Sequence, residues 1–233
     1  MNLNYNLFTK DTQAFVYGMQ ATAVQRMLDF DYVCKRETPS VAAVISPEKE
    51  TSPLKVFFGK SEVLIPVYQT LSDAAKKHPK ADVMLNFASY RSAFQTTMEA
   101  LETGQIKTVA VIAEGIPERK ARIMAATAKK LGKTIIGPAT VGGVAAGKFK
   151  IGNSGGMIDN IIAAKLYRPG SVGLVTKSGG LSNEMYNIIS QNSDGVYEGI
   201  AIGGDLYPGS TYVDHLIRFE KNPEINSEIS RIK

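Results

Sequence analysis

The chain has 233 residues, with 27 Lys and Arg against 22 Asp and Glu, and 44% of its residues are hydrophobic. This apolar content excludes a largely disordered chain, and no run of 18 apolar residues is present to form a membrane span. One cysteine and two distant histidines exclude a disulfide framework and a zinc site of ordinary spacing. The net charge of +5 is spread along the chain, which argues against nucleic acid and suits a polyanionic small molecule. No secretory pattern opens the sequence, so we expect a cytoplasmic protein.

Short apolar runs alternate with amphipathic stretches over the first 136 residues. Strands are predicted at residues 14–17, 41–45, 82–87, 108–113 and 134–136, and a small strand pair is predicted at 56–58 and 63–65. Helices are predicted from residue 21 to 30, from 94 to near Gly104, and from Pro117 to near Gly132. Strands and helices that alternate with short connections predict an α/β fold with a parallel, doubly wound sheet.

The pattern changes after residue 136. Seven of the twenty residues from Gly137 to Gly156 are glycine, which predicts a long loop with a functional or boundary role. A helix is predicted at 157–167, followed by the break Arg168-Pro169-Gly170, a strand at 171–176 and a helix from Leu181 onward. We therefore expect one domain over residues 1–168 and the first part of a second domain over 169–233.

The first strand-to-helix junction is a candidate phosphate site. Gly18 would let the backbone approach a pyrophosphate, which the N-terminus of the next helix would then bind. Only one glycine of a dinucleotide fingerprint is present, so Gln20 and Thr22 would supply polar contacts instead. The alternative is an ordinary turn between a strand and a helix.

A second candidate lies at residues 177–184, where small residues and two hydroxyls precede a helix. Backbone N–H groups there would suit a phosphoryl group, although Ser182 and Asn183 have a second interpretation as helix caps. Asp205 follows an apolar strand, and Glu114 stands at a similar strand end, where α/β sheets bind their ligands. The alternative for Glu114 is a solvated turn carboxylate.

Several ordered motifs resemble a known family. They are AEGIP (113–117), IIGPATVGG (135–143), KIGNSGG (150–156), YRPGSVGLVTKSGGLSNE (167–184) and GIAIGGDLYPGST (199–211). In this order they resemble ATP-citrate lyase and, more distantly, the α subunit of succinyl-CoA synthetase. The earlier segments GMQ (18–20), LDFDYVCKR (28–36) and NFASYRSA (86–93) are similar to the ATP-citrate lyase branch. The resemblance extends from about residue 8 to residue 225.

The resemblance implies a Rossmann-like CoA-binding domain followed by the start of a flavodoxin-like ligase domain. It implies synthesis of citryl-CoA from citrate, CoA and ATP through a phosphohistidine and citryl-phosphate, with later cleavage to acetyl-CoA and oxaloacetate. ATP and Mg²⁺ would bind an ATP-grasp module, and a citryl-CoA lyase module would perform the cleavage. Both modules would be partners in a homo- or hetero-oligomer.

The resemblance also assigns residues to roles. Glu114 is the candidate catalytic residue, either orienting the phosphohistidine or acting as general base for the CoA thiol. No metal ligand is assigned in this chain. The phosphoryl-binding set is Ser178, Gly179, Gly180, Ser182 and Asn183. The CoA-binding set is Gly18, Met19, Gln20, Ala21, Thr22, Lys49, Ala88, Ser89, Arg91, Ser92, Ile112 and Ala113.

This sequence departs from the family pattern in two places. Neither His78 nor His215 has the glycine-rich setting of the family's phosphohistidine, and the residues after Pro223 no longer follow the family pattern. We therefore expect the chain to be a subunit or fragment that is inactive alone. The alternatives are a fragment of a succinyl-CoA synthetase-type ligase and a non-catalytic CoA-binding domain. A nicotinamide-dependent dehydrogenase is disfavoured because the dinucleotide fingerprint is broken.

Overall fold

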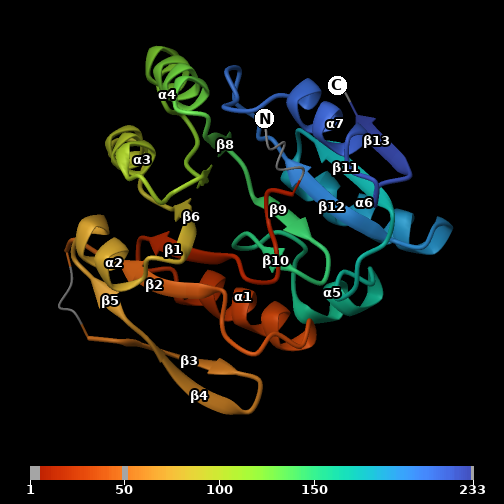
Figure 1. The fold of residues 1–233 in the computed structure, drawn as a ribbon, viewed down its shortest axis with the longest axis horizontal. Coiled ribbons are helices and arrows are strands. Elements are labelled where there is room, and N and C mark those ends of the chain that lie inside the picture. Colours follow the sequence, from red (N-terminus) through yellow and green to blue (C-terminus); the bar gives the residue numbers. More distant parts are fainter. Residues whose placement is uncertain (1–5, 49–51, 232–233) are drawn as a thin grey trace.

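The computed structural model describes residues 6–48 and 52–231, which form two α/β lobes placed side by side (Figure 1). The first lobe contains a parallel six-stranded sheet in the order β5-β2-β1-β6-β7-β8. The expected α/β class is confirmed. The strands are β1 (Gln13–Tyr17), β2 (Val41–Ile45), β5 (Val67–Tyr68), β6 (Ala81–Asn86), β7 (Thr108–Val111) and β8 (Thr134–Ile136).

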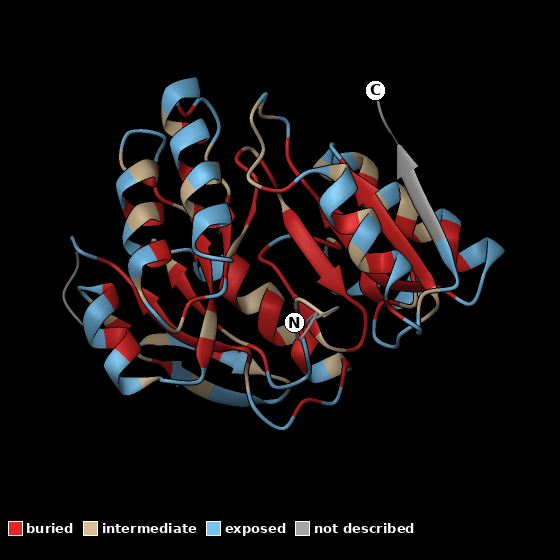
Figure 2. Ribbon diagram, turned by 45° about the horizontal axis from the view of Figure 1, so that its top comes forward, coloured by how far each residue is buried: buried red, intermediate tan, exposed pale blue. Residues whose placement is uncertain are grey.

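Alternate side chains of each strand enter two different cores. Phe15 of β1 packs with α2 (Leu71–Lys77), α3 (Ala93–Glu102) and α4 (Glu118–Lys130) on one face. Its neighbours Ala14 and Val16 pack with α1 (Ala21–Val33) on the other face. Because both faces are covered, these strands are largely apolar and appear mostly buried in Figure 2. The predicted strand pair forms a separate hairpin of β3 (Leu54–Phe58) and β4 (Ser61–Ile65).

The second lobe contains a mixed five-stranded sheet in the order β10-β9-β12-β11-β13. The strands are β9 (Gly142–Ala145), β10 (Phe149–Lys150), β11 (Val172–Thr176), β12 (Val196–Ala201) and β13 (Ser227–Arg231). The helices of this lobe are α5 (Ile158–Ala163), α6 (Gly179–Asn192) and α7 (Tyr212–Glu220). Helix α6 packs on one face of β11 through Leu174, while a Cβ on Gly173 would contact Phe219 of α7 on the other face.

One feature of the second sheet differs from the sequence expectations. The glycine-rich stretch 137–156 is not a continuous loop, because β9 and β10 pair as an antiparallel hairpin and β9 joins β12. The β9 strand was not predicted because two of its four residues are glycines, which lack the alternating side chains that mark a strand. Pairing of β9 with β12 also crosses the expected boundary at residue 168, which stays a prediction. The tail after Pro223 forms β13, parallel to β11.

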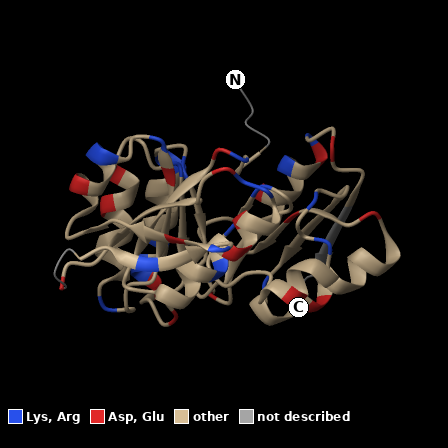
Figure 3. Cartoon of the chain, turned by 90° about the horizontal axis from the view of Figure 1, so that it is seen from below, with Lys and Arg blue, Asp and Glu red and all other residues tan. Residues whose placement is uncertain are grey.

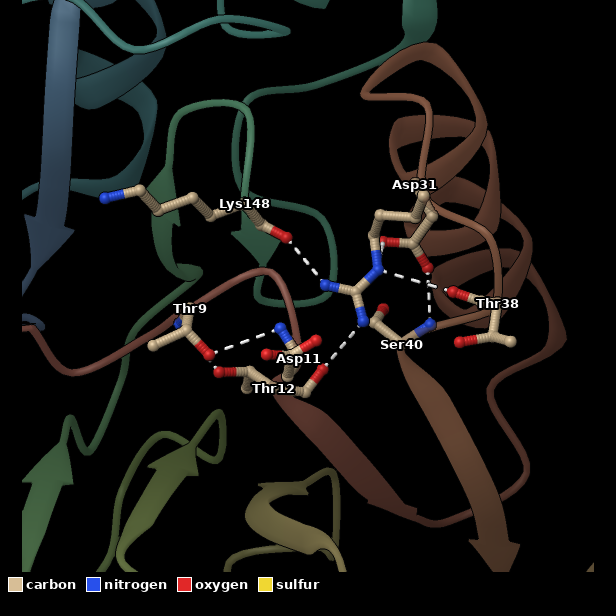
Figure 4. Close-up of polar contacts among 8 residues, drawn as sticks. Thr9, Asp11, Thr12, Asp31, Thr38, Ser40 and Lys148 are labelled. Atoms are coloured by element: carbon tan, nitrogen blue, oxygen red, sulfur yellow. Dashed lines mark hydrogen bonds and ion pairs between the residues drawn. The ribbon is translucent and has the colours of Figure 1, made fainter.

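One buried arginine joins the two lobes. The guanidinium of Arg36 donates to the carbonyls of Thr12 and Lys148 at 3.0 and 2.8 Å, and its Nε lies 3.5 Å from Asp31 (Figure 4). Asp31 in turn accepts the N–H of Ser40 at 2.6 Å. Thr12 precedes β1 whereas Lys148 lies in the β9–β10 hairpin, so this contact fixes the second sheet against the first.

Candidate functional site

The carboxyl ends of the parallel strands meet at one edge of the first sheet. Tyr17 of β1 lies opposite Ile45 of β2 and Asn86 of β6, and Asn86 lies opposite Val111 of β7. The chain runs from β1 to β2 on one side, whereas β6 lies on the other side of β1. The loops after β1 and β6 therefore flank the point where strand order reverses, which is where open α/β sheets bind ligands.

Gly18 makes the tight turn at this point. Its φ is +98°, its N–H donates to the carbonyl of Ile45 at 2.8 Å, and a Cβ on it would lie 3.4 Å from Cβ of Phe87. Helix α1 begins three residues later, and the side chain of its N-cap residue Gln20 makes no capping hydrogen bond. Ala21 and Thr22 are exposed. The first N–H groups of α1 therefore face outward at the sheet edge without a side-chain cap.

The loop after β6 is held by a buried asparagine. Asn86 accepts the N–H of Ala88 at 3.0 Å, and its Nδ2 lies 2.7 Å from the hydroxyl of Thr96 and 2.9 Å from that of Thr97. These bonds fix the start of the loop against α3. Ala88 is buried as a result, while the predicted CoA contacts Ser89 and Arg91 are exposed and Ser92 is half-buried.

Glu114 lies on the loop that follows β7. It is exposed, and the half-buried Ile112 and Ala113 precede it along the same edge. The N–H of Ile112 donates to the carbonyl of Asn86 at 3.0 Å, which continues the sheet pairing past the end of β7. Gly115 turns the chain away with a φ of +75°. Glu114 thus lies beyond the carboxyl end of β7, at the sheet edge that its sequence position predicted.

The second predicted site is a cavity at the N-terminus of α6. Its volume is about 510 Å³, and it is lined by the end of β11, the first turn of α6 and nearby loop residues: Ala139, Thr176, Lys177, Ser178, Gly179, Leu181 and Gly204. Ser178 caps α6, and its hydroxyl accepts the N–H of Leu181 at 3.3 Å. Gly180 is exposed, and a Cβ on it would meet no atom within 4 Å.

The last two residues of this predicted set engage other groups. The buried hydroxyl of Ser182 donates to the carbonyl of Gly179 at 2.6 Å. The half-buried Asn183 accepts the N–H of Gly155 at 3.0 Å through Oδ1. Both side chains are thus occupied within the protein, and their roles toward a ligand stay predictions.

The segment between β8 and β9 brings the two predicted sites together. Ala139 donates its N–H to the carbonyl of Ala113 at 2.9 Å, and its carbonyl accepts the N–H of Gly204 at 3.0 Å. Ala139 also lines the cavity at α6. A backbone bridge of one residue therefore separates the Glu114 loop from the cavity, although these parts of the chain are far apart in the sequence.

Lys49 and Asp205 are the remaining residues that the sequence singled out. Lys49 lies outside the described residues, so its predicted phosphate contact stays a prediction. Asp205 is half-buried and accepts the N–H of Tyr207 at 2.9 Å, which makes it a turn residue in the loop after β12. Figure 3 shows acidic and basic residues interspersed over both lobes, in keeping with the scattered charge of the sequence.

Several buried titratable side chains were not predicted from the sequence. Lys150 is fully buried, and its ammonium donates to the carbonyls of Gly152 and Arg26 at 2.9 and 3.3 Å. Burial lowers the pKa of Lys150 to about 7, and burial likewise raises the pKa of Asp31 to about 6. Burial also raises the pKa of the Cys34 thiol to about 12, so it is a poor nucleophile. A single sequence carries no signal that these polar side chains face inward.

Among residues 6–48 and 52–231, no three His, Cys, Asp or Glu side chains are grouped so as to hold a metal ion. No helix in the same part of the chain has the length and apolar content needed to cross a membrane.

Two protein families match this chain. The CoA binding domain family matches residues 9–115, and the CoA-ligase family matches residues 175–229. The first match contains the Gly18 turn and Glu114, and the second contains the cavity-lining turn at Ser178.

Curated relatives give the same result at higher similarity. The chain is 62% identical over 220 residues to the probable ATP-citrate synthase subunit 1 of Schizosaccharomyces pombe, which covers 94% of this chain and 36% of that protein. It is 58% identical over 219 residues to the human ATP-citrate synthase, covering 94% of this chain and 20% of the human protein. The chain thus spans about a third or less of the length of these relatives.

Solved structures agree in fold. An ATP citrate lyase from Methanothrix soehngenii, solved in complex with citrate and coenzyme A, superposes with a TM-score of 0.95 and 61% identity. The superposition covers 97% of this chain and 36% of that one. A Methanosaeta concilii ATP citrate lyase in complex with (3S)-citryl-CoA gives a TM-score of 0.96 over the same shares.

Proposed function

This chain is a homologue of one portion of ATP-citrate lyase, and on that premise we propose that its first lobe binds coenzyme A for citryl-CoA synthesis. The observation that carries the proposal is the uncapped N-terminus of α1 beside Gly18, placed where the strand order of the sheet reverses. CoA phosphates would accept hydrogen bonds from the free N–H groups of α1, and the dipole of the helix would stabilise their negative charge. Arg91 and Lys49 would add positive charge near solvent.

The second half of the proposal concerns the cavity at α6. The N–H groups of its first turn would receive the phosphoryl group of a phosphohistidine and then of citryl-phosphate. Glu114 would act beside this cavity, since the bridge through Ala139 brings its loop there. Its carboxylate would hold an imidazole in one tautomer and stabilise the imidazolium, or would take the proton of the CoA thiol.

Other parts of the reaction would come from elsewhere. His215 is fully buried and His78 is held by Tyr68 at 3.2 Å, so neither is suited to carry a phosphoryl group between sites. ATP and Mg²⁺ would bind an ATP-grasp module, and a citryl-CoA lyase module would complete cleavage to acetyl-CoA and oxaloacetate. On this proposal the 233 residues bind CoA without a partner, but form citryl-CoA only together with the ATP-grasp module and a segment that supplies the phosphohistidine.

A non-catalytic CoA-binding domain is the second candidate. Calorimetric titration of CoA into the folded chain, followed by turnover with the phosphohistidine-bearing part of the ligase domain and the ATP-grasp and lyase modules added, separates the two. We expect saturable binding that weakens as salt is raised, because phosphate contacts near solvent are screened, and turnover only in the reconstituted enzyme. CoA binding without turnover would leave the non-catalytic function, and absence of binding would overturn both.

A further inference from the structure

The segment from Gly152 to Gly156 lies between the two proposed ligand sites. Toward the first site, Asn153 accepts a hydrogen bond from the guanidinium of Arg26 on α1 at 3.1 Å. A Cβ on Gly152 would lie 3.2 Å from the ring of Phe87, the residue that also packs against Gly18. Lys150 fixes the start of the segment through the carbonyl of Gly152. This end of the segment therefore follows the position of α1 and the Gly18 turn.

Toward the second site, two asparagines bond the backbone of Gly155, and a third asparagine bonds one of them. Asn183 of α6 accepts the N–H of Gly155 at 3.0 Å, and Asn160 of α5 donates to its carbonyl at 2.8 Å. Asn187 of α6 donates to Oδ1 of Asn160 at 2.9 Å. Asn183 and Asn187 are one helical turn apart, so they lie on the same face of α6. Helix α6 thus holds Gly155 both directly and through α5.

Gly155 needs these partners because it is buried in an irregular segment. A buried backbone N–H or C=O without a partner costs about 1–3 kcal/mol, and no strand or helix supplies one here. The side chains around it leave little space, since a Cβ on Gly155 would lie 3.2 Å from Leu166 and 3.3 Å from Val144. Side-chain amides are the groups that can satisfy both backbone atoms of this residue.

We propose that Asn183, Asn160 and Asn187 are positioning residues that couple the CoA turn at Gly18 to the phosphoryl-binding end of α6. The inference rests on the proposed function and deepens it. The asparagines fasten the segment 152–156 to α6, and the same segment packs on Phe87 and Arg26, so the two sites form one rigid unit. Ligand at the first site then stabilises α6 without touching it.

Hydrogen exchange of the whole chain, with and without saturating CoA, tests the coupling. In the wild type, we expect CoA to slow exchange at the first turn of α1, at Gly155 and at the first turn of α6, by about tenfold at Gly155. In Asn183→Leu, protection should persist at α1 and disappear at Gly155 and α6. Asn183→Asp keeps the acceptor and should restore it. Asn192→Ala is the matched control, because Asn192 is exposed and bonds only its own helix at Ile188.

The exchange rates at α1 and at α6 distinguish a failure of the proposed CoA site from a failure of the coupling. Absence of protection at α1 in the wild type would overturn the proposed CoA site. Protection at α1 without protection at α6 would overturn the coupling alone, as would protection at α6 that survives in Asn183→Leu. If Asn183→Leu does not fold, Asn187→Ala removes only the outer bond to Asn160. It should reduce protection at α6 by at least threefold, and unchanged protection would contradict the inference.

Discussion

The hydroxyl of Ser210 lies 2.9 Å from Nε2 of His215, and the same hydroxyl donates to the carbonyl of Ile135 in β8 at 2.7 Å. On the other side of the ring, Nδ1 of His215 lies 3.1 Å from the guanidinium of Arg218, which forms a forked ion pair with Glu198 of β12. A buried polar chain therefore joins the second sheet to the edge of the first.

The buried histidine in this network makes the stability of the protein depend on pH. Burial, then the positive charge of Arg218, lowers the pKa of His215 to about 3 against an ordinary value of 6.5, while Asp214 opposes the shift. Below pH 6.5 His215 is protonated in the unfolded state, whereas in the folded state it stays neutral down to about pH 3. The free energy of unfolding therefore falls as the pH decreases through this window. Urea unfolding at pH 5 and 7.5 should show His215→Gln to be less sensitive to pH than the wild type.

The comparison with His215→Gln isolates one group among several. The raised pKa of Asp31 acts in the opposite direction, because stability then falls as pH rises from about 4 to 6. That contribution is present in both proteins and cancels in the difference. An identical pH dependence in the two proteins would show that His215 is not the buried neutral group described here.

The buried and exposed ion pairs should differ in their contribution to stability. Arg36→Met removes the partner of the buried Asp31, a bond to Thr12 and the interlobe bond to Lys148, so we expect a loss of about 3 kcal/mol. Lys55→Met breaks the pair of Lys55 with Glu62, whose side chains are 63% and 47% exposed, and should cost less than about 1 kcal/mol. Chemical denaturation of both variants measures the difference. Equal losses would contradict the interlobe role of Arg36.

The sequence predicted the first lobe well because its strands and helices follow simple patterns. The apolar run predicted as a strand at 108–113 contains β7, which is buried throughout and ends at Val111, and the helix over 118–130 carries Met124 and Ala128 on one face. Helices α2 and α7 were missed. Each begins with a threonine cap, Thr70 or Thr211, that accepts the N–H of an aspartate three residues later, and this signal could have found them.

The site was predictable only as separate pieces. Strand ends placed Gly18 and Glu114 at one edge, because parallel strands share an edge. The bridge through Ala139 and the bond of Asn183 to Gly155 could not be predicted, since each joins segments distant in sequence and has a backbone group as partner. Backbone hydrogen bonds of this kind leave no pattern in residue type.

The first turn of α6 should tolerate a side chain at Gly180 but not at Gly179. A Cβ on Gly179 would lie 2.5 Å from Val141, whereas one on Gly180 meets nothing within 4 Å. In the complete enzyme, Gly180→Val should suppress histidine phosphorylation at least tenfold and leave CoA affinity and unfolding nearly unchanged. Gly179→Val should lower stability as well. Equal loss of phosphorylation and CoA affinity in Gly180→Val would indicate a folding defect instead of a site.

Glu114 should be needed for turnover and not for CoA affinity. Glu114→Gln keeps the shape and removes the charge, so turnover of the complete enzyme should fall about 10²-fold, the scale of one acid–base contribution. Glu118→Gln is the control, because Glu118 is an exposed residue in the first turn of α4. Near-normal turnover of Glu114→Gln would make Glu114 a solvated turn carboxylate.

The central claim is that CoA binds at the Gly18 turn, and two matched glycine variants test it most directly. Gly18 and Gly132 both have positive φ, +98° and +66°, so alanine at either position costs about 1–2 kcal/mol of backbone strain. Gly132 follows α4 with open space around it, away from the sheet edge. Calorimetric titration of CoA should show affinity at least tenfold weaker for Gly18→Ala and unchanged for Gly132→Ala. Equal affinity in the wild type and both variants would contradict the account.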